Sequence, residues 1–170
     1  RCIITIITTG SQNVAIGMEA GRANTTGFGS TLVGYQAGYS QTAGSGNDSN
    51  NTSIGRQAGY STTTGANNTA VGYNSLLSNT TASNNTAVGV ASSDANTTGE
   101  NNTSVGASSL GANTTGNNNT AIGMNSMRDS TTGTDNVAVG LNTLLSNTTG
   151  STNIAIGKDA LDSNTTANDN

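Results

Sequence analysis

The chain has 170 residues, of which 31% are apolar, 3% aromatic and 8% charged, and it contains neither Trp nor Pro. Such a composition does not support a conventional globular core, and it lacks the high charge that keeps disordered chains in solution. The net charge of −4 and the five scattered basic residues also exclude the electrostatic footprint of a nucleic-acid-binding protein.

The first segment, residues 1–11, contains four isoleucines in a short apolar run. This run is too short for a transmembrane helix and lacks a signal-peptide cleavage pattern. Its end, Thr-Thr-Gly-Ser, has the spelling of residues 148–151. We predict that residues 1–11 form a degenerate first coil or the start of a fragment.

A 17-residue unit accounts for the remainder of the chain. The frame of residues 67–83, NNTAVGYNSLLSNTTAS, fits eight segments of 17 residues and one longer segment, residues 29–49, which carries four extra residues. A fixed short period is the signature of a solenoid. We therefore predict an all-β parallel β-solenoid of nine coils over residues 12–168, with residues 169–170 starting a further repeat. Neither end resembles a capping unit, so we expect a segment of a longer fibre or a unit that stacks on copies of itself.

The fifth position of the unit gives the strongest strand signal, because it is always a β-branched aliphatic residue. Position three lies on the same face of a strand. We expect both positions to face inward, and position four, mostly Ala, to leave room for a neighbouring chain. The predicted structural core consists of Ile16, Val33, Ile54, Val71, Val88, Val105, Ile122, Val139 and Ile156.

Position six is Gly in every copy, which predicts a corner that needs a positive φ or has no room for a Cβ atom. The predicted corner glycines are Gly17, Gly34, Gly55, Gly72, Gly89, Gly106, Gly123, Gly140 and Gly157.

The second half of the unit combines small, apolar and turn-forming residues. Position nine is always small and position ten is often Leu or Met, so we expect a second short strand after the glycine. The recurring Asn-Thr-Thr-Gly tail is typical of a turn. We expect the repeated Asn and Thr side chains to stack in hydrogen-bonded ladders about 4.7 Å apart.

Aromatic and basic residues recur at two positions of the first coils. Tyr35 and Tyr73 share position seven with Arg56 between them, whereas Tyr39 and Tyr60 share position eleven with Arg22 before them. We expect stacked columns on the outer surface, which could contact a glycan or merely stabilise the stack. The extra residues around 41–46 are expected to form a loop beside them.

Enzymatic chemistry is not expected. The chain has no His and a single Cys, which excludes His-based catalysis, His metal sites and a thiolate zinc site. The nine carboxylates fall at differing repeat positions and form no facing pair. We predict no catalytic residues, no metal site and no cofactor.

One coil buries too little apolar surface to offset the entropy of ordering its backbone, so we predict a homo-oligomer, preferably of three chains. The hexapeptides QNVAIG at 12–17, DNVAVG at 135–140 and TNIAIG at 152–157 resemble the head repeats of YadA-like trimeric autotransporter adhesins. The longer pattern of residues 85–89 followed by 96–99 is similar to repeats of bacteriophage and other viral tail-fibre proteins. The unit is longer than the usual adhesin repeat. The resemblance implies a left-handed trimeric β-roll exposed outside the cell or on a virion.

The expected function is therefore that of a structural and adhesive fibre segment, which projects and spaces a receptor-binding surface on a cell or a virion. The expected partners are copies of the chain itself and possible glycan or protein receptors, without nucleic acid or membrane insertion. Two alternatives remain open: an extracellular filament of subunits stacked end to end, and an ice-binding solenoid. The adjacent Thr pairs disfavour the latter, because in extended geometry they point to opposite sides.

Overall fold

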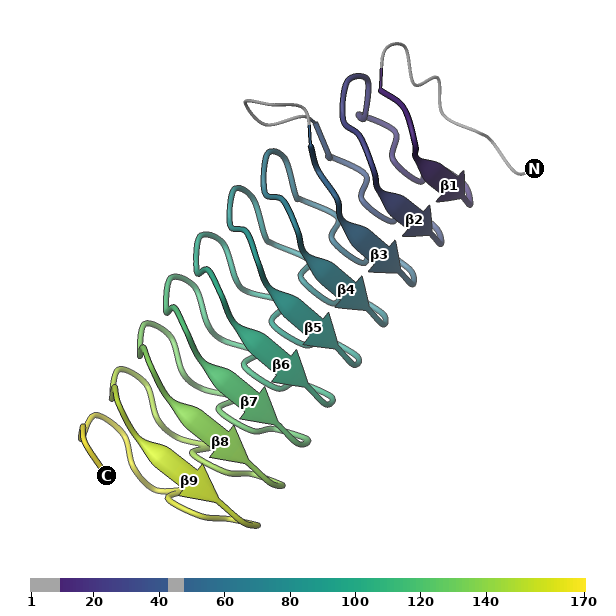
Figure 1. Ribbon diagram of the computed structural model, residues 1–170. Coiled ribbons are helices and arrows are strands. Elements are labelled where there is room, and N and C mark those ends of the chain that lie inside the picture. The colour runs from purple at the N-terminus through teal and green to yellow at the C-terminus, as the bar shows by residue number, and fades with distance from the viewer. Residues whose placement is uncertain (1–9, 43–47) are drawn as a thin grey trace.

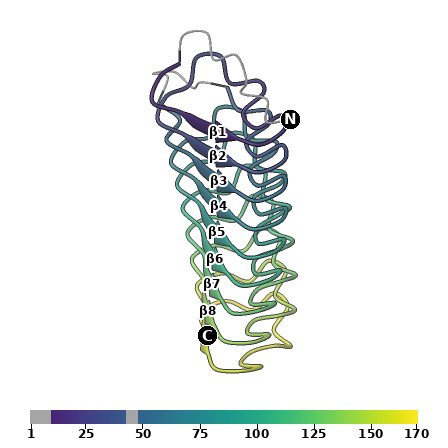
Figure 2. The ribbon, with the colours of Figure 1, turned by 90° about the vertical axis from the view of Figure 1, so that its right-hand side faces the viewer.

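The computed structural model describes residues 10–42 and 48–170, and these contain strands but no helix. Nine three-residue strands form one parallel sheet in sequence order (Figure 1). They stack in single file along one side of a rod-shaped β-solenoid, as Figure 2 shows. The strands are β1 (Val14–Ile16), β2 (Thr31–Val33), β3 (Thr52–Ile54), β4 (Thr69–Val71), β5 (Thr86–Val88), β6 (Thr103–Val105), β7 (Thr120–Ile122), β8 (Val137–Val139) and β9 (Ile154–Ile156).

The strand pairing follows the sequence repeat residue by residue. Val71 of β4 pairs with Val88 of β5, which in turn pairs with Val105 of β6. The longer copy preserves this register, since Thr31 of β2 still pairs with Thr52 of β3. Each repeat is therefore one coil, and below we call the coil that contains strand βn coil n. The predicted loop at 41–46 lies largely outside the described residues, as do residues 1–9 of the predicted first coil.

The predicted orientation of the strand residues is wrong. From β2 to β9 the middle residue, at position four, is buried, while positions three and five are partly or largely exposed. In coils 4, 6, 7 and 8 a buried Leu or Met at position ten fills the interior, so only a small residue fits opposite it at position four. None of the predicted core residues is buried: Ile16, Val33, Ile54, Val71, Val88, Val105, Ile122, Val139 and Ile156 lie on the outer face of the sheet.

The actual core consists of positions four, nine and ten. Leu110, Met127 and Leu144 are fully buried and cluster with the alanines at position four of the neighbouring coils. Position nine is buried as well, from Ala20 to Thr143. The small residues at positions four and nine therefore pack inside their own coil and do not leave room for another chain.

The predicted second strand is absent from the described coils, where turns follow the corner glycine. Positions eight and ten adopt left-handed backbone conformations, with φ of 56° at Asn125 and 53° at Met127. Two left-handed residues separated by one other residue cannot belong to an extended strand. They instead fold the chain tightly and turn the large position-ten side chain inward.

In coil 2 the large residue lies at position four, opposite the side that it occupies in later coils. Gly21 and Gly38 occupy position ten, and Leu32 occupies position four of the coil between β1 and β3. A Cβ atom on Gly38 would lie 2.6 Å from Cδ2 of Leu32. The two glycines therefore leave the space that the leucine fills.

The predicted Asn ladders are present, and they are buried. At position two, the Asn102 side chain accepts a hydrogen bond from the Asn119 backbone N–H at 2.9 Å and donates one to the Gly116 carbonyl at 2.9 Å. At position thirteen, Asn113 donates to the Asn96 side chain at 2.8 Å. The bonds of Asn102 supply partners for backbone N–H and C=O groups that the corners would otherwise leave unpaired. The ladder at position two also includes Asn170, whose backbone N–H donates to the Asn153 side chain.

The corner glycines have the predicted conformation. All nine have a positive φ, between 119° and 140°. In addition, the corners of successive coils touch: a Cβ atom on Gly106 would lie 2.5 Å from the Gly123 carbonyl oxygen. Both of the reasons considered for the glycine therefore apply, the backbone conformation and the lack of space.

Candidate interaction surfaces

The most prominent surface is the outer side of the sheet, formed by positions three, five and seven, which we call the sheet face. Side chains alternate along an extended chain, so the buried residue at position four directs its neighbours outward. Position seven follows the corner glycine at the border of this face and is exposed in seven of the nine coils. Large apolar residues exposed on the sheet face are Val14, Ile16, Met18, Ile54, Tyr73, Val90, Val105, Ile122, Met124, Ile154 and Ile156.

The sheet face extends along the whole rod without interruption. Nine strands at a spacing of about 4.7 Å give a length of about 40 Å, and the five residues from position three to seven give a width of about 15 Å. The face therefore covers on the order of 600 Å², which is large for an apolar patch on a monomeric protein. The exposure of Ile122 (40%) and Val105 (36%) shows that the middle coils contribute as well as the ends. On monomeric proteins, apolar patches of this size are often interaction sites.

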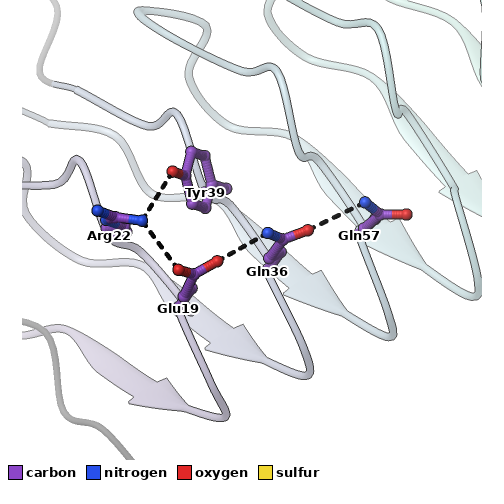
Figure 3. A network of polar contacts seen from close by, with 5 residues as sticks. All are labelled: Glu19, Arg22, Gln36, Tyr39 and Gln57. Carbon is purple, nitrogen blue, oxygen red and sulfur yellow. Dashed lines mark hydrogen bonds and ion pairs between the residues drawn. The ribbon is translucent and has the colours of Figure 1, made fainter.

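The aromatic column at position eleven forms as predicted. Tyr39 and Tyr60 stack with ring centroids 4.9 Å apart and an interplanar angle of 12°. The Arg22 guanidinium lies 5.6 Å from the Tyr39 centroid, donates a hydrogen bond to the Tyr39 hydroxyl at 3.1 Å and pairs with Glu19 at 2.8 Å (Figure 3). The carboxylate of Glu19 also accepts a bond from Gln36. This column is therefore internally paired.

The column at position seven also forms. The Arg56 guanidinium lies 5.8 Å from the Tyr35 centroid and 5.3 Å from the Tyr73 centroid, and it donates a hydrogen bond to the Tyr73 hydroxyl at 3.2 Å. The six candidate glycan residues thus form two separate columns, four residues apart along each coil. Position seven borders the exposed strand residues of the sheet face. The sequence analysis did not predict this neighbourhood, because it expected positions three and five to face inward.

The faces of several of these rings are already in use. Tyr39 stacks on Tyr60 and has Arg22 against it, and Tyr35 and Tyr73 both contact the guanidinium of Arg56. A sugar that stacks on an aromatic ring needs a free face. The columns therefore serve first to hold successive coils together, and contact with a glycan stays a prediction.

Two carboxyl groups on the outer turns have perturbed pKa values, in opposite directions. Burial raises the pKa of Asp94, and backbone hydrogen bonds offset part of this effect. Hydrogen bonds from Arg128, at 2.7 and 2.9 Å, lower the pKa of Asp129. In the described part of the chain no three potential ligands among His, Cys, Asp and Glu lie close enough together to hold a metal ion.

A comparison with protein-family models, curated proteins and solved structures finds no match. Within residues 10–42 and 48–170 there is no helix that could cross a membrane. The sheet face is the main feature of the described residues that the packing of the coils leaves unexplained.

Proposed function

We propose that this chain is a structural segment of an extracellular or virion fibre, in which three parallel copies pack through their sheet faces and project a receptor-binding surface. The sheet face is the observation that supports this proposal. Its position five is a β-branched aliphatic residue in every coil, flanked by Thr, Val or Ile at position three and mostly apolar residues at position seven, whereas the rest of the coil surface carries mostly Asn, Thr, Ser and charged residues.

A second copy is the partner that fits the sheet face best. A partner that contacts each of nine equivalent strands in the same way must have the same rise of about 4.7 Å per unit, and another copy of this chain has it. The estimated area of about 600 Å² for each chain approaches the 800 Å² that each partner contributes to a standard interface. Association through this face would bury the β-branched residues that the single chain leaves exposed.

Three chains and a left-handed coil are proposed from the resemblance to the adhesin and tail-fibre repeats. A closed ring of three uses the sheet face of every copy and leaves none exposed, which favours a discrete particle over open-ended growth. The location outside a cell, on its surface or on a virion, belongs to the same proposal.

The test is the mass of the purified chain in solution, measured by light scattering or sedimentation. We expect a discrete trimer. The variant Val105→Asp/Ile122→Asp places two charges on the sheet face and should shift the mass to that of the monomer, because ionised groups at the centre of an interface are strongly unfavourable. The matched control Thr115→Asp/Thr132→Asp introduces the same charges in the same two coils at exposed turn residues and should remain a trimer.

Other outcomes would contradict this proposal. Open-ended polymers would favour the alternative of a filament stacked end to end. A stable monomer would leave the sheet face to water, where its outward Thr residues at position three, from Thr31 to Thr120, form a single regular file. Thermal hysteresis of such a monomer would favour the ice-binding alternative.

Contact with a glycan is a second proposed activity, since the columns combine aromatic and guanidinium groups on one half of the rod. If it is correct, the wild-type chain binds a subset of a glycan array and the variant Tyr39→Ala/Tyr60→Ala loses at least about tenfold in affinity, as expected when stacking on a ring is lost. The variant Leu145→Ala changes the same repeat position in coil 8 and should bind normally. Equal binding by all three proteins would contradict a role of the position-eleven column.

A further inference from the structure

The two edges of the sheet face carry opposite charges. On the edge that follows the strands, position seven, the charged residues are Arg56 and Lys158, both basic. On the edge that precedes the strands, the charged residues among those described are all acidic, and these are Asp48, Glu100, Asp135 and Asp169. The apolar strip between the edges therefore has a basic border and an acidic border.

Arg56 is the described cation that lacks a carboxylate partner. Arg22, Arg128 and Lys158 form ion pairs with Glu19, Asp129 and Asp159 of the same chain. The guanidinium of Arg56 instead lies between two tyrosine rings, 5.8 and 5.3 Å from their centroids, and donates a hydrogen bond to the Tyr73 hydroxyl. The rings hold the charge in place at the border of the sheet face without neutralising it.

Asp48 is the acidic residue at the matching height of the rod. It lies at the end of coil 2, two residues before coil 3, which contains Arg56 at position seven, and it is exposed. Its backbone pairs with Phe28 in an isolated parallel bridge, which ties it to the preceding coil. The strand β3 separates the two residues within one chain, so they cannot form a pair there.

We propose that copies of this chain associate in parallel and in register, and that Arg56 of one copy pairs with Asp48 of the next. This inference depends on the proposed packing through the sheet face. When rods with the same direction pack around a common axis, the basic border of each faces the acidic border of its neighbour. In an antiparallel pair, like borders meet and repel.

The far end of the rod carries charges of the same signs on the same borders, although Lys158 already pairs with Asp159 of its own chain. Lys158 lies on the basic border in coil 9, while Asp135 and Asp169 lie on the acidic border at the start of coil 8 and just after coil 9. A parallel neighbour in register would thus place acidic groups within about one coil height of Lys158. A slip by one coil would separate Arg56 from Asp48, so this pair selects a register that the apolar strip by itself does not specify.

The experiment is a charge exchange in the full chain. Arg56→Glu alone and Asp48→Arg alone should each weaken association at least about tenfold, measured as the dissociation constant of the assembly, because each puts like charges together. The double variant Arg56→Glu/Asp48→Arg should recover most of this loss. Arg128→Glu, on the outer turn at position eleven, is the matched control and should associate as the wild type does. Circular dichroism should show the same folded signal for the single, double and control variants. If one of them fails to fold, the neutral substitutions Arg56→Gln and Asp48→Asn take its place.

Orientation is measured separately. The variant Asn168→Cys, in a Cys2→Ser background, carries one dye per chain. Energy transfer is then measured between the dyes of different copies. Parallel packing places the same ends of the rods together and gives high transfer. Low transfer, or a double variant that is no better than the single ones, would overturn the proposed pairing while the assembly itself persists. A wild-type chain that remains a monomer would instead overturn the proposed function and this inference together.

Discussion

The variant Gly106→Ala is expected to lose about 3 kcal/mol or more of its free energy of unfolding, the largest effect we predict for a single methyl group. Gly106 has a φ of 134°, which side-chain-bearing residues rarely adopt, and the added Cβ atom would lie 2.5 Å from the Gly123 carbonyl oxygen. Backbone strain contributes about 1–3 kcal/mol. The contact with the backbone of the next coil adds to this, because the hydrogen-bonded ladder cannot move aside locally.

Two further glycines separate the causes of this loss. Gly157→Ala introduces the same methyl at a φ of 119°, but nothing lies within 4 Å of the new atom, so only the strain should remain. Gly111 has no positive φ, and its nearest contact would be at 3.4 Å, so Gly111→Ala should be nearly neutral. Denaturant unfolding monitored by circular dichroism measures all three. Equal losses for Gly106→Ala and Gly157→Ala would show that the contact between coils is unimportant.

The variant Asn102→Asp is expected to lose about 3 kcal/mol or more at pH 7. The Asn102 side chain is 3% exposed and donates a hydrogen bond to the Gly116 carbonyl at 2.9 Å. An ionised carboxyl has the same shape but no donor, so it would leave the carbonyl unpaired and place a charge in the core without a counterion.

The loss should depend on pH with a defined sign. Burial disfavours the ionised form of a carboxyl, so the introduced group has a higher pKa in the folded than in the unfolded chain. The protonated form favours folding. Its contribution to the free energy of unfolding is fully present below the pKa of the unfolded chain, about 3.9, and is lost as the pH rises through the higher pKa of the folded chain. The difference from wild type, measured by unfolding at each pH, should therefore shrink below about pH 4.

The adjacent residue provides the control. Asn101 is exposed and left-handed, with φ of 58°, and the same repeat position is already Asp at Asp135 and Asp169. Asn101→Asp should change stability by less than about 0.5 kcal/mol at any pH. If Asn102→Asp behaved like Asn101→Asp, the internal ladder would not be a major source of stability in this fold.

Several features of this fold follow from the sequence alone, because the repeat makes each of them recur. A fixed period and a β-branched residue at position five predict the strands and their register, and the invariant glycine predicts the corner. The Asn and Thr residues predict the ladders, and the spacing of Arg22, Tyr39 and Tyr60 predicts one stacked column. Each prediction needs only the rule that equivalent residues of successive coils lie on top of one another.

The direction in which the strands face could not be obtained in this way. Alternation places Val71 and Ala70 on opposite sides of the strand, but it does not determine which side faces the interior. The greater hydrophobicity of Val71 predicted that its side would face inward, and this was wrong. The tertiary structure decides it through volume: left-handed residues at positions eight and ten fold the coil tightly, Leu76 fills the interior, and only the small Ala70 fits opposite. The β-branched column is then left outside. An apolar sheet face with charged borders therefore results from the narrowness of the coil, which no single repeat reveals.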